Sequence, residues 1–188
     1  SRAELFKAAE LFDQAFSGKF GNAIPRDNLR IKFWSEILHP DQIVGAYINN
    51  ELAGLALLTF EDRPGFLKSA KKSLFRILGP FGGMKAALYF ALFSKLDKKI
   101  RFPTAYLEAI SVSEKYRGIG IGNQLIGEAG RIVKKEGNSS LLLQVVIENQ
   151  SAKKLYERIG FTVVSTSSTP ILKFFTDIGG AHLMELKL

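Results

Sequence analysis

The spacing of hydrophobic residues predicts two helices at the start of the chain. Over residues 3–16 apolar side chains recur three and four positions apart, which is the period of one helix face. Gly18 and Gly21 are expected to end this helix. Residues 27–38 repeat the pattern, and His39-Pro40 closes it, because the residue before a proline disfavours helical backbone angles.

Strand patterns begin after these helices. Residues 43–48 and 52–60 flank an Asn-Asn turn, which predicts a β-hairpin. Strand and helix patterns then alternate toward the C-terminus. The expected strands are 106–112, 141–147, 161–165 and 182–188, and the expected helices are 123–136 and a short one from 148 to Gly160. Because residues 141–147 are mostly apolar, we expect this strand to be covered on both faces and to have parallel neighbours.

The segment 62–101 differs from the rest of the chain in pattern and in charge. It predicts a helical hairpin of residues 66–78 and 84–96, broken by the glycines and proline of 79–83. The second helix is apolar almost all round, so something must cover it. The segment holds ten Lys/Arg and two acidic residues, whereas the remainder has sixteen of each, so the whole net charge of +8 belongs to this segment.

Composition excludes several classes of protein. The 188 residues contain no cysteine and two distant histidines, His39 and His182, so neither a disulfide framework nor a zinc or histidine-triad enzyme is expected. No signal peptide and no run of ~20 apolar residues is visible, which leads us to expect a cytoplasmic protein. The length suits one complete core, and we expect a single domain over residues 1–188.

One glycine-rich stretch carries the clearest chemistry. Arg117, Gly118, Gly120 and Gly122 lie between an expected strand and an expected helix. Glycines let backbone N–H groups approach a ligand closely, and a helix N-terminus attracts anions. The stretch lacks the lysine of a P-loop, and Asn123 stands where a dinucleotide fingerprint needs its last small residue. An anion site therefore fits the whole stretch, although Gly118 alone would suit an ordinary turn.

Two signatures give the chain a family resemblance. Arg117, Gly120 and Gly122 match R/Q-x-x-G-x-G/A, and the stretch resembles the acyl-CoA-binding signature of the GNAT family of N-acetyltransferases. Residues 149–161 are similar to the family's second signature, N-x-x-A-x-x-L-Y-x-x-x-G-F. The pair, about thirty residues apart, makes the resemblance specific over residues 106–161. It implies the GNAT fold, an α/β fold with a mixed, mostly antiparallel sheet and flanking helices.

The chain departs from the family pattern in two places. No strand is visible before the first helix, and residues 62–101 form a helical-hairpin insertion between strands that a short turn normally joins. Both departures concern the acceptor side. The resemblance therefore carries neither the identity of the amine acceptor nor the acyl preference to this chain.

The resemblance implies acetyl-CoA as co-substrate, with no metal. In the family the loop amides hold the pyrophosphate, and the strands ending here at Val112 and Ile147 splay apart beside the pantetheine. Asn149 either contacts the pantetheine or caps the helix. The implied coenzyme A contacts are Ile110, Val112, Arg117, Gly118, Ile119, Gly120, Ile121, Gly122, Asn149, Ala152 and Tyr156.

Three residues are candidates for the chemistry. Glu108 is the first choice as base, because strand alternation would place it on one face with Ile110 and Val112, and Glu148 is the second. Glu108 would equally suit an ion pair or the rim of a site. Tyr156 matches the family's general acid, and we interpret it first as a hydrogen-bond donor to the leaving thiolate. A helix-face core position is the alternative for this tyrosine.

These observations predict transfer of the acetyl group of acetyl-CoA to a primary amine of a small molecule, peptide or protein. Attack is expected to be direct, in a ternary complex, since no cysteine can carry the acetyl group. The alternatives are a non-catalytic acyl-CoA sensor and a membrane- or nucleic-acid-surface protein built around residues 62–101. We expect no nucleic-acid partner. We expect the hairpin to pack on the acceptor side of the sheet or on a second subunit of a homodimer, more than on a membrane, because Ala86, Ala87 and Ala91 suit close helix packing.

Overall fold

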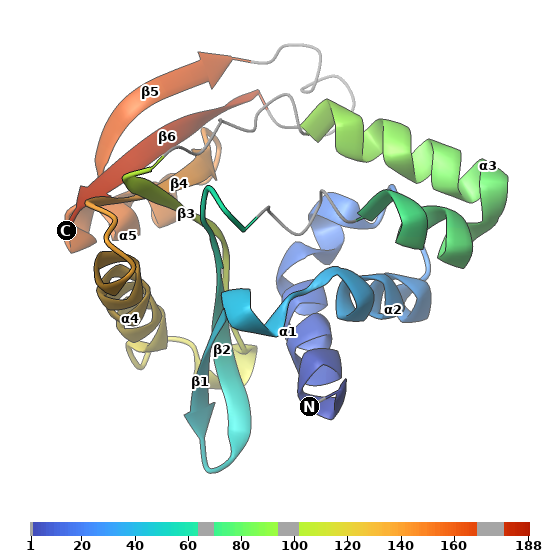
Figure 1. Cartoon of the computed structure of the whole chain (residues 1–188), viewed down its shortest axis with the longest axis horizontal. Coiled ribbons are helices and arrows are strands. Elements are labelled where there is room, and N and C mark those ends of the chain that lie inside the picture. The colour runs from blue at the N-terminus through green and yellow to red at the C-terminus, as the bar shows by residue number, and fades with distance from the viewer. Residues whose placement is uncertain (1, 64–69, 94–101, 169–178) are drawn as a thin grey trace.

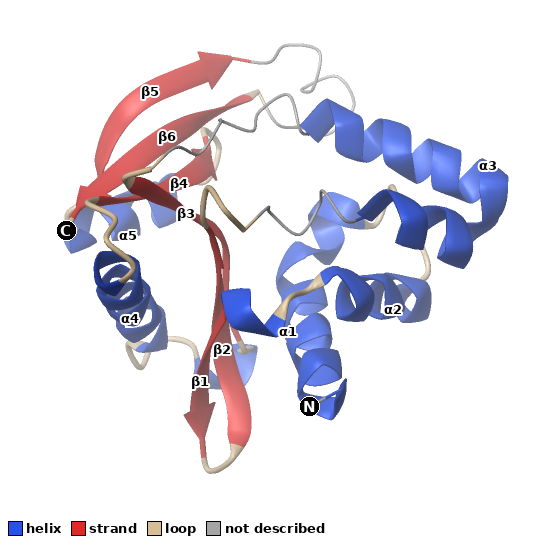
Figure 2. Cartoon of the chain, viewed as in Figure 1, coloured by secondary structure: helices blue, strands red, loops and turns tan. Residues whose placement is uncertain are grey.

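A mixed six-stranded sheet forms the centre of the molecule (Figure 2). The computed structural model describes residues 2–63, 70–93, 102–168 and 179–188. The strand order is β1-β2-β3-β4-β6-β5. The strands are β1 (Ile43–Ile48), β2 (Glu51–Thr59), β3 (Thr104–Val112), β4 (Ser140–Val146), β5 (Thr162–Ser168) and β6 (Gly180–Lys187). Each lies within a few residues of its predicted position, and the β1–β2 turn places Asn49 and Asn50 at positive φ, as the tight hairpin requires.

Among the strands of the described residues, one neighbouring pair is parallel. β3 and β4 run in the same direction, and α4 (Ile121–Lys135) connects them as the expected crossover helix. The other neighbour of β4 is β6, which is antiparallel, so the prediction of parallel neighbours is wrong on that side. The apolar residues of β4 indicate that the strand is central and covered on both faces. They do not indicate whether a neighbouring strand is parallel or antiparallel.

Helices cover both faces of the sheet (Figure 1). α1 (Arg2–Phe20), α2 (Asp27–Ile37) and α3 (Ala70–Phe93) lie on one side, and α4 and α5 (Gln150–Ile159) lie on the other. β2 feeds both cores, because Leu55 and Leu57 join the α1 side while Ala56 and Leu58 join the α4 side. We name these two halves the α1 face and the α4 face.

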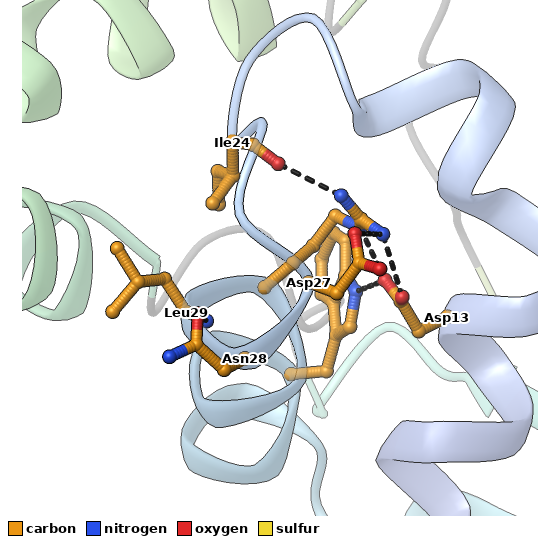
Figure 3. A network of polar contacts seen from close by, with 7 residues as sticks. Asp13, Ile24, Asp27, Asn28 and Leu29 are labelled. Carbon is orange, nitrogen blue, oxygen red and sulfur yellow. Dashed lines mark hydrogen bonds and ion pairs between the residues drawn. The ribbon is translucent and has the colours of Figure 1, made fainter.

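The α1 face is held by aromatic packing and by one buried ion pair. α1 continues through Gly18 to Phe20, beyond its predicted end, because Phe20 packs edge-on against Trp34 at a centroid distance of 5.1 Å. Asp13 accepts hydrogen bonds from Arg30 Nη2 at 2.8 Å and from Trp34 Nε1 at 2.9 Å (Figure 3). Arg30 Nη1 donates to the Ile24 carbonyl at 2.9 Å. Since removing one partner of such a pair leaves a buried charge, the network fixes α1 against α2.

Within the segment 62–101, the described residues Ala70–Phe93 form a helix with a sharp bend. The non-helical angles of α3 are confined to Gly79 (φ 69°, ψ −179°), and Pro80 begins its second half, so the predicted break is shorter than residues 79–83. The ends of the predicted helices, at 66–69 and 94–96, fall outside the described residues.

α3 packs on the other helices of the α1 face. Phe90 lies against Phe20, Phe33 and Trp34, with centroid distances of 5.3, 5.7 and 6.3 Å. α3 therefore packs on α1 and α2, and the prediction that its second half packs directly on the sheet is wrong. Among the described residues, no helix combines the length and the apolar character needed to cross a membrane.

Candidate active site

The parallel strands β3 and β4 are paired over only part of their length and then separate. Their pairing begins at Thr104 and Ser140 and ends at Leu107 and Leu143, although β3 continues to Val112. A cavity of about 380 Å³ opens where the ladder stops. Its walls come from α1, β3, β4 and α5, and the lining residues are Ala15, Phe16, Leu107, Glu108, Ala109, Ile110, Leu143, Gln144, Val145, Val146, Asn149, Ala152 and Tyr156.

A β-bulge stands at the point of divergence. Leu57 pairs with Ala109 and Leu58 pairs with Leu107, so Glu108 is the extra residue of β3. A bulge bends its strand and turns a side chain out of the normal alternation. Thr59 Oγ1 donates to Glu108 Oε1 at 2.9 Å, and Thr59 lies between two residues of the α4 face, so both side chains are on the α1 face.

The bulge contradicts the strand alternation from which Glu108 was chosen as the candidate base. Ile110 and Val112 pack against the α4 face, whereas Glu108 points to the α1 face. The three residues therefore do not share a strand face as alternation predicted. Glu108 and Ile110 nevertheless both line the cavity, because the cavity lies in the gap between β3 and β4 and is reached from both faces.

Tyr156 reaches the cavity from α5. Its ring stands edge-on to the buried ring of Phe161, with centroids 5.8 Å apart, and the side chain is half-buried. Among the described residues, no group is hydrogen-bonded to its hydroxyl. Burial raises the pKa of Tyr156 above that of a free tyrosine, so the hydroxyl stays protonated at neutral pH. The arrangement presents a hydrogen-bond donor to the cavity.

Both ends of α5 are fixed by the local sequence. Asn149 Oδ1 accepts the backbone N–H of Ala152 at 3.1 Å, so of the two readings of this residue the helix cap is confirmed. Asn149 also lines the cavity, and its contact with pantetheine stays a prediction. At the other end Gly160 adopts φ 110° as the C-terminal cap. These caps fix where α5 begins and ends, and packing of Ala152, Tyr156 and Ile159 on the core of the α4 face turns this side of the helix inward.

The glycine-rich loop ends at the N-terminus of α4. Gly118 and Gly120 adopt φ of 81° and 90°, which is why glycine is required at these two positions. A Cβ placed on either would meet nothing within 4 Å, so the space above the loop is open. Gly120 caps α4 without a side-chain hydrogen bond, and the first N–H groups of a helix have no partner within it. The backbone of Ile119, Ile121 and Gly122 thus borders a site suited to an anion.

Arg117 lies on the exposed side of this loop. Its Nη1 is 3.3 Å from Glu114 Oε1, and its Nε donates to the Val112 carbonyl at 3.3 Å. Both distances are at the long end for hydrogen bonds, and the guanidinium is solvent-exposed. An arginine held this loosely is available to a phosphate.

One polar contact that holds the loop was not predicted from the sequence. Glu51 Oε2 accepts hydrogen bonds from Lys115 Nζ at 2.6 Å and from the Tyr116 hydroxyl at 2.7 Å. These bonds lower the pKa of Glu51 below its ordinary value. They connect the start of β2 to the short helix η4 (Glu114–Tyr116), more than sixty residues away in the chain. No local motif predicts such a pair.

The second candidate base lies elsewhere. Glu148 is exposed, accepts the N–H of Gly179 at 2.8 Å and is not among the residues that line the cavity. Ala15 and Phe16 of α1 are wall residues that sequence reasoning missed, because a helix pattern does not reveal which strand gap the helix covers. Ser111 Oγ donates to the Leu11 carbonyl at 2.9 Å and keeps α1 beside that gap.

Comparison with known proteins identifies the family. The sequence model of the acetyltransferase (GNAT) family matches residues 7–161. N-alpha-acetyltransferase 30 of Xenopus laevis is 38% identical over 99 residues, which are 52% of this chain and 34% of that protein. The 5-NmdU N-acetyltransferase of Pseudomonas phage PaMx11 is 33% identical over 72 residues, 38% of this chain and 49% of that protein. The matches thus span between a third and a half of these curated relatives.

Solved structures share the fold at lower identity. An acetyltransferase from Staphylococcus aureus Mu50 gives a TM-score of 0.67 at 16% identity, covering 99% of this chain and 97% of that one. An acetyltransferase from Bacillus anthracis str. Ames, solved in complex with acetyl coenzyme A, gives a TM-score of 0.53 at 21% identity, covering 81% and 66%. With the family model matched over most of its length, this chain belongs to the GNAT acetyltransferase family.

Proposed function

We propose that this chain transfers the acetyl group of acetyl-CoA to a primary amine by direct attack. The observation that carries the proposal is the cavity between β3 and β4, which both Tyr156 and Glu108 line. One is a protonated donor and the other an acceptor. A thioester held between them would have a donor for its leaving sulfur and an acceptor for the proton of its attacking amine.

Coenzyme A would lie with its pyrophosphate on the glycine loop and its pantetheine in the gap. The amides of residues 118–122 and the positive end of the α4 dipole suit the phosphates. Arg117 would exchange its long contact with Glu114 for a two-pronged contact with phosphate oxygens. Ile110 and Val112 of β3, and Asn149 and Ala152 of α5, would border the pantetheine.

The attacking amine must be neutral. A lysine-type amine has a pKa near ~10.4, so deprotonation at pH 7 costs roughly 4–5 kcal/mol. Glu108 would take up the proton, directly or through water. Thr59 of β2 is buried, and its hydroxyl donates a hydrogen bond that holds one carboxylate oxygen of Glu108 in place.

The departing thiolate would be stabilised by a hydrogen bond from Tyr156. Because burial raises the pKa of this phenol while a thiol has a pKa near ~8.5, complete proton transfer to the sulfur is uphill. A hydrogen bond from the Tyr156 hydroxyl to the sulfur stabilises the thiolate without this unfavourable proton transfer. The charge on sulfur develops as the bond breaks, so the bond to Tyr156 strengthens on the way to the transition state.

A thiol-release assay tests this function. Purified protein with acetyl-CoA and a panel of amines, N-terminal peptides and polyamines should release free coenzyme A only when an acceptor is present. Acetyl-CoA binding by calorimetry, measured on the same sample, separates the outcomes. Binding without release across the panel would indicate the acyl-CoA sensor and overturn the enzyme.

Arg117→Ala should weaken acetyl-CoA binding about 10-fold, the expected loss for one charge-assisted contact to phosphate. Arg131→Ala is the matched control, because Arg131 is an exposed arginine paired with a glutamate three residues earlier. Equal affinities for the two variants would remove Arg117 from the site.

A further inference from the structure

The outer side of α3 presents large apolar side chains to solvent. Phe81, Met84 and Leu88 are 91%, 63% and 65% exposed and follow the i, i+3, i+7 spacing of one helix face. We call these three residues the outer stripe. Figure 1 shows α3 at the outer edge of the α1 face, beside α2, with α1 nearer the sheet.

Packing within the chain does not account for the outer stripe. The opposite side of the same helix half supplies Ala86 and Phe90, which are 0% and 7% exposed, to the core of α1 and α2. Ala86 and Phe90 thus make the packing contact of this helix half with α1 and α2. Three exposed side chains of this size on one protruding helix are more than isolated surface apolar residues explain.

The charges of α3 all have one sign. The helix contains four basic residues, Lys71, Lys72, Arg76 and Lys85, and no acidic residue. Arg76 is paired with Glu36 of α2 at 2.5 Å, whereas the three lysines are exposed. Lys85 follows Met84 directly and precedes Leu88 by three positions, so it lies beside the outer stripe.

We propose that α3 docks on an anionic lipid surface, with the outer stripe inserted among the headgroups and the three lysines contacting them. Apolar and aromatic residues interleaved with lysine are the composition of helices that lie in a membrane interface. Lysine side chains can place their methylene groups along the apolar layer while the ammonium reaches phosphate. The inference is independent of acetyl transfer, since it uses no residue of the cavity or the glycine loop.

A second copy of the chain is a less favourable occupant. A symmetric dimer through the outer stripe would bring Lys85 of both subunits together, in a chain whose net charge is already +8. An anionic bilayer satisfies both the apolar residues and the lysines.

Vesicle co-sedimentation of the full chain tests the proposal. Vesicles of phosphatidylcholine with roughly one-third phosphatidylserine should bind the protein, and vesicles of phosphatidylcholine alone should bind it at least about 10-fold more weakly. Raising the salt from about 0.1 M to about 1 M shortens the screening length from ~10 Å to ~3 Å and should release most of the bound protein.

Two sets of variants with matched controls locate the surface. Lys71→Gln, Lys72→Gln and Lys85→Gln together should weaken binding about 100-fold, at roughly 5-fold for each lysine near an anionic leaflet. Lys134→Gln, Lys135→Gln and Lys154→Gln change the net charge equally at exposed positions of α4 and α5, and should retain most of the affinity. Equal losses in the two sets would mean non-specific attraction by net charge and would overturn the proposal.

Phe81→Ser, Met84→Ser and Leu88→Ser together should also weaken binding about 100-fold. The control is Phe6→Ser, Tyr47→Ser and Val164→Ser, at positions that are 46%, 56% and 48% exposed outside α3. Melting temperature and acetyl-CoA affinity verify that each variant is folded. If wild-type protein ignores anionic vesicles but sediments as a dimer that the outer-stripe variant dissociates, the occupant is a second copy and the lipid assignment is wrong.

Discussion

The two faces of the sheet are built from the chain in different ways. On the α4 face, the glycine loop, α4 and α5 come from one continuous stretch, residues 113–160, in which the loop angles and the caps of α5 are set by neighbours in sequence. Gly118 and Gly120 set the shape of the loop through their positive φ angles. Asn149 caps α5 by accepting a hydrogen bond from the backbone N–H of Ala152, three residues later. On the α1 face the contacts are distant. Thr59 and Glu108 are 49 residues apart, and Ser111 and Leu11 are 100 apart.

This difference explains what a short signature can transfer from one protein to another. A local motif carries its own geometry wherever it occurs, so the donor side of the site is readable from a few residues. The acceptor side depends on how α1, α2 and α3 are placed, and those placements rest on packing such as Phe90 against Trp34. Family membership therefore supports a common co-substrate and leaves the amine open.

The largest expected effect is on the α4 face. Tyr156→Phe should lower kcat by about 10²–10³ with little change in the KM for acetyl-CoA, because the lost hydrogen bond strengthens only as the thiolate departs. Steady-state kinetics at saturating acceptor measure this. Tyr47→Phe, an exposed tyrosine of β1, is the control and should behave as wild type. A large rise in KM with unchanged kcat would instead indicate that Tyr156 is a wall of the binding site.

The next effect concerns binding. Gly120→Val should raise the Kd for acetyl-CoA about 100-fold, because valine at φ 90° is strained and its side chain occupies the open space above the loop. Calorimetry on the folded variant measures this, with melting temperature as a check. Gly127→Val is the control, because Gly127 lies within α4 and a Cβ there also meets nothing within 4 Å. Wild-type affinity in a folded Gly120→Val protein would remove the loop from the site.

On the α1 face, Glu108→Gln should lower kcat/KM about 10-fold at neutral pH and move the rise of the pH–rate profile to higher pH. Without the carboxylate, the amine must lose its proton to solvent before it attacks. A larger fraction of the amine is deprotonated at higher pH, so the rate rises at higher pH. Glu148→Gln is the comparison, since Glu148 does not line the cavity. If Glu148→Gln moves the profile and Glu108→Gln does not, the base lies in the connection between β4 and α5.

The sequence predicted the elements better than their relations. Strand and helix positions came from hydrophobic period, and Gly160 was correctly placed as a helix cap because capping is local. The bulge at Glu108 was missed because alternation along β3 continues smoothly in the sequence, and only pairing with β2 reveals the extra residue. The antiparallel β6 was missed for the same reason, since burial of β4 carries no information on direction.

The extent of α1 shows the same limit. Gly18 and Gly21 predicted an earlier end, yet tertiary packing of Phe20 extends the helix past Gly18. Glycine weakens a helix by roughly 1 kcal/mol, which is less than the burial of one phenylalanine contributes. Packing from α2 and α3 decided the outcome, and that packing is invisible to a local pattern.

The smallest predicted effect is at the Glu51 contact between the β1–β2 hairpin and the glycine loop. Glu51→Gln should raise the KM for acetyl-CoA by roughly 2-fold and leave kcat unchanged, because the hydrogen bonds from Lys115 and Tyr116 position the loop without touching the reaction. Glu51 is exposed, so water competes with both bonds and the effect stays small. Glu128→Gln, which breaks an exposed pair with Arg131 inside α4, is the control and should not change KM.

The pH dependence of this contact has a definite sign. The bonds to Lys115 and Tyr116 lower the pKa of Glu51 in the folded protein, so the contact is fully formed above the ordinary glutamate value of 4.5 and is lost as pH falls through the lowered one. The ratio of acetyl-CoA affinities between wild type and Glu51→Gln should therefore be constant from neutral pH down to about 4.5 and approach one below it. Taking the ratio cancels titration of the phosphates of coenzyme A, which both proteins experience equally. A ratio that changes between pH 6 and pH 8 would show that Glu51 is not the titrating group, and the loop would then be positioned by the α4 face alone.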